Sequence, residues 1–268
     1  MPELVHGIDV SSYQPRDLSG IIGEHQPAHV VVRMYLPEER PPEEHSRSQG
    51  KSARANGCSV GAYVWAYRSL DPYPTIRNAV GLARRCDLEP PVLWIDCESY
   101  REGGVLKDAG PDAAWLHAAI DECRTLGVTP GIYTGGWWWR EYMGNTTEFA
   151  DLPLWTAHYD EIADLGKVAL FGGWTRACGK QYSEKLPDGR GLDRNVFLEE
   201  VCMRPDAEPP TIEALEVAIP DLRRHLDEWQ DARKGNGEEP YDYAAFRQHL
   251  LLIGAPDPGP LEFVGFRG

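Results

Sequence analysis

The sequence predicts an α/β fold, namely a modified (β/α) TIM-like barrel with a small C-terminal helical appendage. Two observations predict this fold class. Strand-like and helix-like segments alternate through residues 1–204, which favours a parallel sheet covered by helices. Continuous apolar runs such as Val30-Val31-Val32 are typical of strands that are covered on both faces. The chain has 268 residues, which is enough for one such barrel and a short extension.

The predicted strands are short and are separated by helices or turns. In chain order they cover residues 6–10, 28–34, 60–66, 92–96, 131–134, 154–157, 168–171 and 180–183. Helices are predicted at residues 43–56, 73–86, 111–126 and 137–143. Pro111-Asp112 is a typical helix start and Gly127 a typical stop. The later gaps are short and rich in turn residues, so the last strands are not expected to alternate with full helices.

The composition changes near residue 205. Residues 205–268 contain 13 acidic and 6 basic residues and are punctuated by Pro and Gly. Helices are predicted there at 220–234 and 242–253, with Leu222, Leu226 and Trp229 on one stripe of the first. This acidic segment is too short to bury much core alone. We therefore expect a barrel at 1–204 and a docking or packing extension at 205–268.

Composition also limits the classes of partner. The formal net charge is −15, which argues against nucleic-acid binding because no basic surface offsets phosphate repulsion. No run of 18 apolar residues predicts a membrane span. No signal-peptide pattern follows Met1. We expect synthesis in the cytoplasm and, if the target is extracellular, release by lysis, export by another route or carriage on a particle.

Four acidic residues are the most informative feature of the sequence: Asp9, Asp96, Glu98 and Asp193. Three of them directly follow a short apolar run, so each lies where a buried strand would end. Carboxylates that strand ends deliver from distant parts of a chain indicate one shared active site. Glycoside hydrolysis is the chemistry that most often uses paired carboxylates in a site of this size.

Asp96 and Glu98 are expected to point to the same side of the chain. They are two residues apart on or just past a strand, so period-2 alternation sends both inward, with Cα atoms roughly 6–7 Å apart. Cys97 then points outward, toward the helices. Crowding with Asp9 and Asp193 is expected to raise at least one pKa, which suits a general acid. The simpler interpretation, that these acids are turn residues or helix caps, stays open for Asp9 taken alone.

Aromatic residues near the predicted strand ends support a sugar site. Tyr63, Trp65 and Tyr67 occupy alternate positions of one strand and so line one face. Flat aromatic faces suit the apolar C–H faces of sugar rings. The alternative is that inward aromatic residues only fill the barrel.

Two other patterns carry no function. Gly57-Cys58-Ser59-Val60-Gly61 has the spacing of a serine-hydrolase elbow, but a helix precedes it and a strand follows, which is the reverse of that motif. His25 and His29 have the spacing of helical metal ligands, but Pro27 lies between them and no acid is near. No metal site and no cofactor are therefore expected.

An ordered set of short motifs resembles glycoside hydrolase family 25, the lysozymes typified by phage and bacterial N-acetylmuramidases. The motifs cover nearly all of residues 5–198. They are Gly7-Ile8-Asp9-Val10-Ser11-Ser12-Tyr13-Gln14, Gly61-Ala62-Tyr63-Val64-Trp65, Val92-Leu93-Trp94-Ile95-Asp96-Cys97-Glu98, Pro130-Gly131-Ile132-Tyr133-Thr134-Gly135, Pro153-Leu154-Trp155-Thr156-Ala157, Gln181-Tyr182-Ser183 and Leu192-Asp193-Arg194-Asn195-Val196-Phe197. Any one of them is weak, whereas the ordered set is specific.

The resemblance implies a peptidoglycan hydrolase without a cofactor, which cleaves the β-1,4 bond between N-acetylmuramic acid and N-acetylglucosamine. Glu98 matches the family's proton donor. Asp96 matches the acid that holds the acetamido group or stabilises the developing cation, and Asp9 and Asp193 match the remaining carboxylates. The residues expected to bind the glycan strand are Tyr63, Trp65, Tyr133, Trp155, Gln181 and Tyr182.

Four features depart from the family pattern. Val32-Arg33-Met34-Tyr35 replaces the small and acidic residues often found after the second strand, and Trp174–Gln181 carries extra residues. Lys180 stands where an aromatic commonly precedes Gln-Tyr-Ser, and Arg194 adds a cation expected to lower the pKa of Asp193. The leading hypothesis is a phage-encoded endolysin or tail-associated lysin. The alternative is a barrel that binds wall glycan without cutting it, as a structural part of a phage tail. The four acids favour the enzyme, while 205–268 leaves open a contact with other tail proteins.

Overall fold

The structure is a computed structural model that describes residues 3–35, 42–86, 88, 90–185 and 191–202. All of them belong to the unit Met1–Pro205. The predicted acidic extension, 205–268, lies outside the described residues together with its two predicted helices. Its role as a docking or packing segment therefore stays a prediction.

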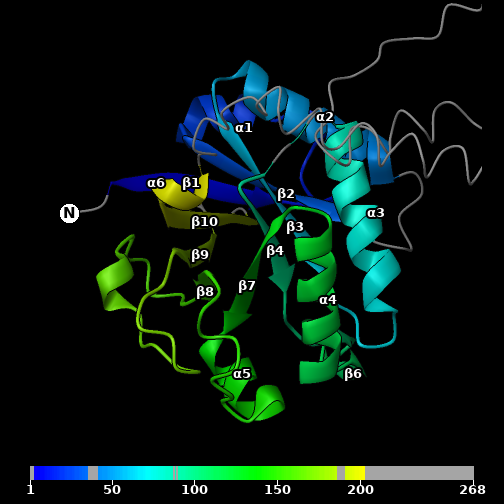
Figure 1. The fold of residues 1–268 in the computed structure, drawn as a ribbon. Coiled ribbons are helices and arrows are strands. Elements are labelled where there is room, and N and C mark those ends of the chain that lie inside the picture. The colour runs from blue at the N-terminus through cyan, green and yellow to red at the C-terminus, as the bar shows by residue number, and fades with distance from the viewer. Residues whose placement is uncertain (1–2, 36–41, 87, 89, 186–190, 203–268) are drawn as a thin grey trace, which may run out of the picture. The chain divides into compact units, whose positions relative to one another are not determined.

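Eight strands close into a barrel in the order β1-β10-β9-β8-β7-β4-β3-β2 (Figure 1), which confirms the predicted fold class. Their neighbours are parallel except around β10, which is antiparallel to both β1 and β9. The strands are β1 Leu4–Val10, β2 His29–Tyr35, β3 Ser59–Trp65, β4 Val92–Asp96, β7 Thr129–Gly135, β8 Leu154–Ala157, β9 Gly179–Lys185 and β10 Gly191–Leu198.

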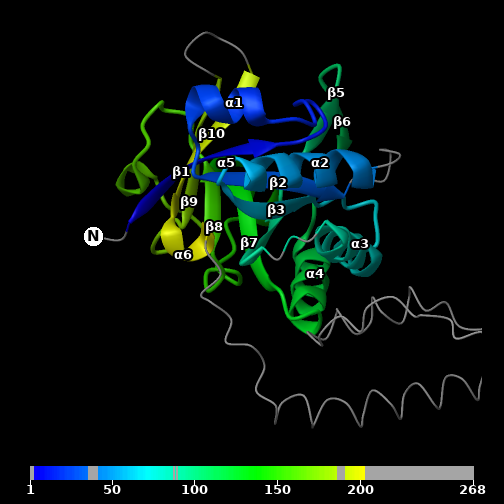
Figure 2. The ribbon, with the colours of Figure 1, turned by 90° about the horizontal axis from the view of Figure 1, so that it is seen from above.

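The helices α1 Ser19–His25, α2 Pro42–Ala55, α3 Pro72–Arg85 and α4 Ala113–Thr125 cover the outside of the first half of the barrel (Figures 1 and 2). Two further helices lie later in the chain: α5 Gly136–Met143 follows β7, and the short α6 Glu199–Cys202 follows β10. The side chain of Asp112 accepts the N–H of Trp115 and so caps α4, and Gly127 follows it at φ +68°. No helix in the described ranges is long and apolar enough to cross a membrane.

The last strands follow one another without long helices, as predicted, since only the 3₁₀ turn Leu165–Lys167 lies between β8 and β9. The predicted strand at 168–171 is wrong. Within that apolar run only Phe171 is buried, packed against Trp139 and Trp174 on the outside of the barrel. The eighth strand is instead β10, whose polar Asp193-Arg194-Asn195 hides its strand pattern. The helix α1 and the hairpin of β5 Tyr100–Glu102 and β6 Val105–Asp108 were not predicted.

Two apolar layers hold the barrel. The outer layer lies between strands and helices and includes Leu93, Ile95 and Cys97. The inner layer fills the barrel and includes Val92 and Trp94, so the predicted alternation along β4 is confirmed. Trp94, Trp155 and Phe197 pack together in the interior, with ring centroids 5.3–6.3 Å apart.

Two glycines make room for these large rings. A Cβ atom on Gly131 would lie 2.6 Å from the Trp94 ring, and one on Gly179 would lie 2.6 Å from the Phe197 ring. The interior is therefore a packed core rather than a pore. Any chemistry takes place above it, at the carboxyl ends of the parallel strands.

Candidate active site

The four acids occupy the same end of the barrel by two different routes. Asp9 lies near the end of β1, Asp96 ends β4, and Glu98 follows two residues later. Asp193 lies near the start of β10, and because β10 is antiparallel its start meets the ends of the other strands. The register pairs Asp9 directly with Asp193. The antiparallel strand is thus what adds the fourth acid to the cluster.

Asp9 lies at the centre of a buried hydrogen-bond network. Its Oδ2 accepts Nε2 of Gln181 at 2.9 Å and Nδ2 of Asn195 at 2.7 Å. The Gln181 Oε1 accepts the hydroxyls of Tyr133 at 2.6 Å and Tyr159 at 2.7 Å. Asn195 Oδ1 accepts the indole N–H of Trp155 at 2.9 Å. Each amide is held at its oxygen, so its N–H₂ group faces the carboxylate.

Asp9 and Asp193 share a hydrogen bond between their side chains, and burial raises both pKa values. Hydrogen bonds from Asn195 and Gln181 oppose the rise in the pKa of Asp9. For Asp193 burial and then the charge of Asp9 raise the pKa to about 9. Two carboxyl groups this close do not both ionise near neutrality, so the pair holds a proton, and Asp9 is its better stabilised anion.

The prediction that Arg194 lowers the pKa of Asp193 is wrong. The guanidinium of Arg194 instead pairs with Glu161, donates through Nε to the Lys185 carbonyl at 2.9 Å, and lies 5.0 Å above the Tyr182 ring. Adjacent residues of a strand point to different sides, which directs Arg194 away from the acid that precedes it.

Glu98 and Asp96 differ in burial and in partners. Glu98 is partly exposed; burial and then the charge of Asp9 raise its pKa to about 7, and a hydrogen bond between Glu98 and Tyr133 opposes the rise. Asp96 is 3% exposed, and burial, with the charges of Glu98 and Asp9, raises its pKa well above the ordinary value, while Arg33 opposes the rise. Its Oδ1 has no hydrogen-bond partner among the described residues, and the same holds for the buried Nε1 of Trp65 on the neighbouring strand.

The predicted glycan-binding residues fall into two groups. Tyr63, Tyr133 and Gln181 lie beside the acids. Gln181 and Tyr133 are hydrogen-bonded in the network around Asp9, and burial, together with the charges of the acids, raises the pKa values of Tyr63 and Tyr133. Trp65 is partly exposed and stacks on Tyr67 with centroids 6.0 Å apart.

For Trp155 and Tyr182 the structure favours packing over the predicted contact with sugar. Trp155 is 2% exposed, because its ring fills the barrel interior between Tyr133 and Phe197. Tyr182 follows Gln181 directly, so alternation turns it to the opposite face of β9, under Arg194.

Three residues of the site were missed by the sequence predictions. Asn195 lies two positions after Asp193 on the same strand, and period-2 alternation could have found it. Arg33 follows the inward-facing Val31 by the same spacing, and its Nη2 donates to Ser12 Oγ at 2.8 Å. Tyr159 had no such signal, because the loop after β8 brings it to Gln181. Within the described ranges no group of three or more His, Cys, Asp and Glu residues is arranged to hold a metal ion.

A barrel with clustered carboxyl groups at the carboxyl ends of its parallel strands defines the class: a glycoside hydrolase-like barrel. The family described as "Lysozyme-like protein 1" matches residues 3–182. "Lysozyme-like protein 5" of Caenorhabditis elegans is 30% identical, over 55% of this chain and 70% of that protein. "Probable GH family 25 lysozyme 3" of Dictyostelium discoideum is 29% identical over 55% of this chain, which spans 31% of that protein's length.

Solved structures share the fold. A family GH25 lysozyme from Aspergillus fumigatus superposes with a TM-score of 0.56 at 21% identity, covering 73% of this chain and 94% of that one. The modular autolysin LytC from Streptococcus pneumoniae, in complex with a synthetic peptidoglycan ligand, gives a TM-score of 0.58 at 16% identity, over 73% and 47% of the two chains. The chain belongs to the glycoside hydrolase family 25 lysozymes.

Proposed function

We propose that this chain is a lysozyme that hydrolyses the β-1,4 bond between N-acetylmuramic acid and N-acetylglucosamine in peptidoglycan. The observation that carries the proposal is the pairing of two unlike acids. Glu98 is partly exposed and its pKa lies at about 7, whereas Asp96 is deeply buried and keeps an oxygen that no described residue contacts by a hydrogen bond. Two carboxyl groups in different environments are the usual arrangement of glycosidases. The peptidoglycan ligand of the similarly folded autolysin supports the same substrate class.

In this mechanism protonated Glu98 gives its proton to the glycosidic oxygen as the bond from C1 breaks. Water supplies the hydroxyl group to C1, and its proton returns to a carboxylate of the cluster. The Oδ1 of Asp96 and the Nε1 of Trp65 lie on adjacent strands at paired positions. Both atoms are buried in this structure; an acetamido group has one N–H donor and one carbonyl acceptor, so it would satisfy both of them once substrate binding uncovers them.

The test compares wild type with Glu98→Gln in clearing a suspension of purified peptidoglycan between pH 4 and 8. We expect the wild type to clear it and the variant to lose activity by about 100-fold or more, since proton transfer contributes that much. Binding of glycan without clearing by the wild type at any pH would favour the alternative, a barrel that binds wall glycan as a structural protein.

We further propose that the enzyme works as a phage lysin, made in the cytoplasm and then either released at lysis or carried on the virion. The acidic segment 205–268 supports the tail-borne form of this proposal, because its 13 acidic and 6 basic residues and its two predicted helices suit a segment that docks on another protein. A tail-borne enzyme needs only a docking segment of this size. Co-purification of the protein with virions, and its loss from them when 206–268 is deleted, would test the tail-borne form; recovery only in the soluble lysate would exclude it.

A further inference from the structure

Lys180 is fully buried, which is unusual for a lysine side chain. It adjoins Gln181 on β9, so alternation places it on the face of that strand away from Asp9. Its side chain is 0% exposed, and its Nζ donates to Asp160 Oδ1 at 2.7 Å and to the Ile162 carbonyl at 2.8 Å. A buried ammonium is tolerated only when it is paired and hydrogen-bonded. Lys180 therefore fixes the loop that follows β8 to the outside of β9.

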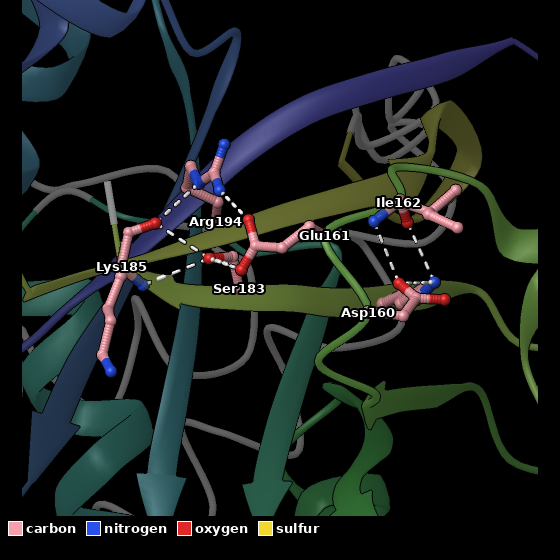
Figure 3. A network of polar contacts seen from close by, with 7 residues as sticks. Asp160, Glu161, Ile162, Ser183, Lys185 and Arg194 are labelled. Atoms are coloured by element: carbon pink, nitrogen blue, oxygen red, sulfur yellow. Dashed lines mark hydrogen bonds and ion pairs between the residues drawn. The ribbon is translucent and has the colours of Figure 1, made fainter. Parts of the chain in front are cut away.

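A second anchor holds the same loop one residue later. The Glu161 carboxylate accepts the Ser183 hydroxyl at 2.6 Å and pairs with the Arg194 guanidinium (Figure 3). Figure 3 also shows Asp160 beside Ile162, whose N–H it accepts at 3.0 Å. Glu161 has φ 59°, a left-handed conformation that residues other than glycine rarely adopt. Side-chain contacts to β9 and β10 thus hold the backbone in a conformation it would otherwise leave.

Tyr159 lies directly before these two anchors. Backbone bonds flank it, from His158 N to Gln181 O at 2.9 Å and from Glu161 N to Tyr182 O at 3.1 Å. The residue is 53% exposed, yet its hydroxyl donates to Gln181 Oε1 at 2.7 Å. An exposed tyrosine side chain keeps one position only if its backbone is fixed. The loop is therefore in a position to govern this hydrogen bond.

We infer that the two ion pairs, Lys180–Asp160 and Arg194–Glu161, form a clamp that positions Tyr159 against Gln181 and so keeps the Gln181 amide turned toward Asp9. This inference rests on the proposed function and adds positioning residues to its site. Lys180, Asp160, Glu161 and Arg194 act through Tyr159 and Gln181 rather than on the substrate. Loss of the clamp leaves Tyr133 as the remaining hydroxyl donor to the Gln181 oxygen. The amide is then held less firmly, which weakens its hydrogen bond to ionised Asp9 and raises the pKa of the Asp9–Asp193 pair.

Among the described residues, only one of the groups around Asp9 comes from the clamped loop. Within the same ranges, the titratable or charged groups that face Asp9 and its network are Asp193 on β10, Asp96 and Glu98 at the end of β4, Arg33 on β2, Tyr63 on β3, Tyr133 on β7, and Tyr159. Glu184 adds its charge to Asp193. Changes to the clamp leave all of these except Tyr159 in place, so a shift in the Asp9 pair reports on that contact.

The test uses Tyr159→Phe, Lys180→Met and the double variant in the full chain. The readouts are the pH profile of kcat/KM on soluble glycan chains and the carboxyl titration of ¹³C-labelled aspartate. We expect each single change to move the acidic limb, and the titration of the Asp9 pair, upward by about half a pH unit or more. The double variant moves no further than the larger single change, because both act through one hydrogen bond.

Arg77→Met is the matched control. Arg77 Nε pairs with the buried Glu122 at 2.6 Å between α3 and α4, away from the four acids of the site. Loss of this ion pair should lower Tm without moving the pH profile of kcat/KM or the aspartate titration. The inference is overturned if Lys180→Met lowers Tm as the control does but leaves the acidic limb of the kcat/KM profile in place. It is also overturned if Tyr159→Phe shifts neither that limb nor the titration of the Asp9 pair. Should Lys180→Met fail to fold, Tyr159→Phe and Asp160→Asn decide. If the wild type cleaves no glycan, the proposed function fails, and the aspartate titration alone still decides the clamp.

Discussion

At the residue scale, the central feature of the site is that Asp9 on β1 lies directly opposite Asp193 on the antiparallel strand β10. Like charges at directly opposed positions destabilise a sheet, and burial adds to that cost. Amide donors from Gln181 and Asn195 converge on the Asp9 carboxylate, whereas Asn195 reaches only the backbone carbonyl of Asp193 among the described contacts, which makes the two acids unequal. The proton of the pair then resides mainly on Asp193, and Asp9 is the anion whose charge raises the pKa of Glu98.

Asp193→Asn should stabilise the protein at alkaline pH. The pKa of Asp193 is about 9 in the folded state against an ordinary 3.8, so between these values the native state holds a proton that the unfolded state releases. Stability therefore falls as pH rises from about 4 to about 9. We expect the variant to gain about 1–2 kcal/mol at pH 8, a figure reduced for partial exposure, and little at pH 4. Thermal melts across this range measure it.

The exposed helical residue Asp121, whose side chain is 70% exposed, supplies the control for that experiment. Asp121→Asn should change Tm equally little at both pH values. An Asp193→Asn variant that is less stable than wild type at pH 8 would show that Asp193 is ionised in the folded protein.

Glu98 should set the alkaline limb of activity. As the general acid it works only when protonated, and burial together with the charge of Asp9 raises its pKa to about 7. We expect kcat/KM on soluble glycan to fall about tenfold per pH unit above that value. A limb near pH 4.5, the ordinary value for a glutamic acid, would contradict this assignment.

Period-2 alternation predicted which residues of β4 face the site and which face the helices. It placed Val92 and Trp94 inward and Cys97 outward, as the structure has them. It did not reveal the partners of charged side chains. Arg194 was expected to act on its neighbour Asp193, yet it pairs with Glu161, which is 33 residues away along the chain. Such pairs depend on loop paths that local sequence does not encode.

At the element scale, one antiparallel strand and one short hairpin complete the site. β10 brings Asp193 and Asn195 to Asp9, and the β5–β6 hairpin follows Glu98 directly. The predicted strand at 168–171 and the missed strand β10 share one cause. An apolar run such as 168–171 predicts a strand that does not form, whereas β10 is a strand that carries polar residues because its inner face ends in the acid cluster. A strand that carries residues of the site therefore departs from the apolar pattern by which buried strands are recognised.

Gly110 should control the position of Glu98. A Cβ atom there would lie 2.4 Å from the Glu98 carbonyl oxygen and 2.6 Å from the Trp138 ring, so Gly110→Ala must displace one of them. We expect kcat/KM to fall by about 100-fold, which is the cost of a shift of about 1 Å in a catalytic group. Gly104→Ala in the hairpin turn is the matched control. Gly104 has the same φ of +81° but no atom near its Cβ position, so that variant carries the same backbone strain without the contact. Equal losses of activity in the two variants would refute the role of this contact.

At the scale of the whole molecule, the residues that stabilise the barrel are separate from the residues of the candidate active site. Trp94, Trp155 and Phe197 fill the interior, and the polar network lies above them at the carboxyl ends of the strands. The fold class was predictable because alternating elements and buried apolar runs recur along the whole barrel sequence. The closure by β10 was not predictable from such runs.

Deletion of residues 206–268 should leave catalysis intact. All residues of the described site lie within Met1–Pro205. We expect a chain of residues 1–205 to turn over soluble glycan within about twofold of the full chain, since a domain with its own core folds alone. Circular dichroism and activity on soluble glycan measure this. Failure of the truncated chain to fold would show instead that the extension packs on the barrel.

The most direct test of the proposed activity is the identity of the new reducing ends that the full chain releases from purified peptidoglycan. Borohydride reduction followed by mass spectrometry distinguishes the two sugars. The account predicts N-acetylmuramic acid at the reducing ends from the wild type, and none above background from Glu98→Gln. Release of N-acetylglucosamine at the reducing ends, or equal release by the Glu98→Gln variant, would contradict it.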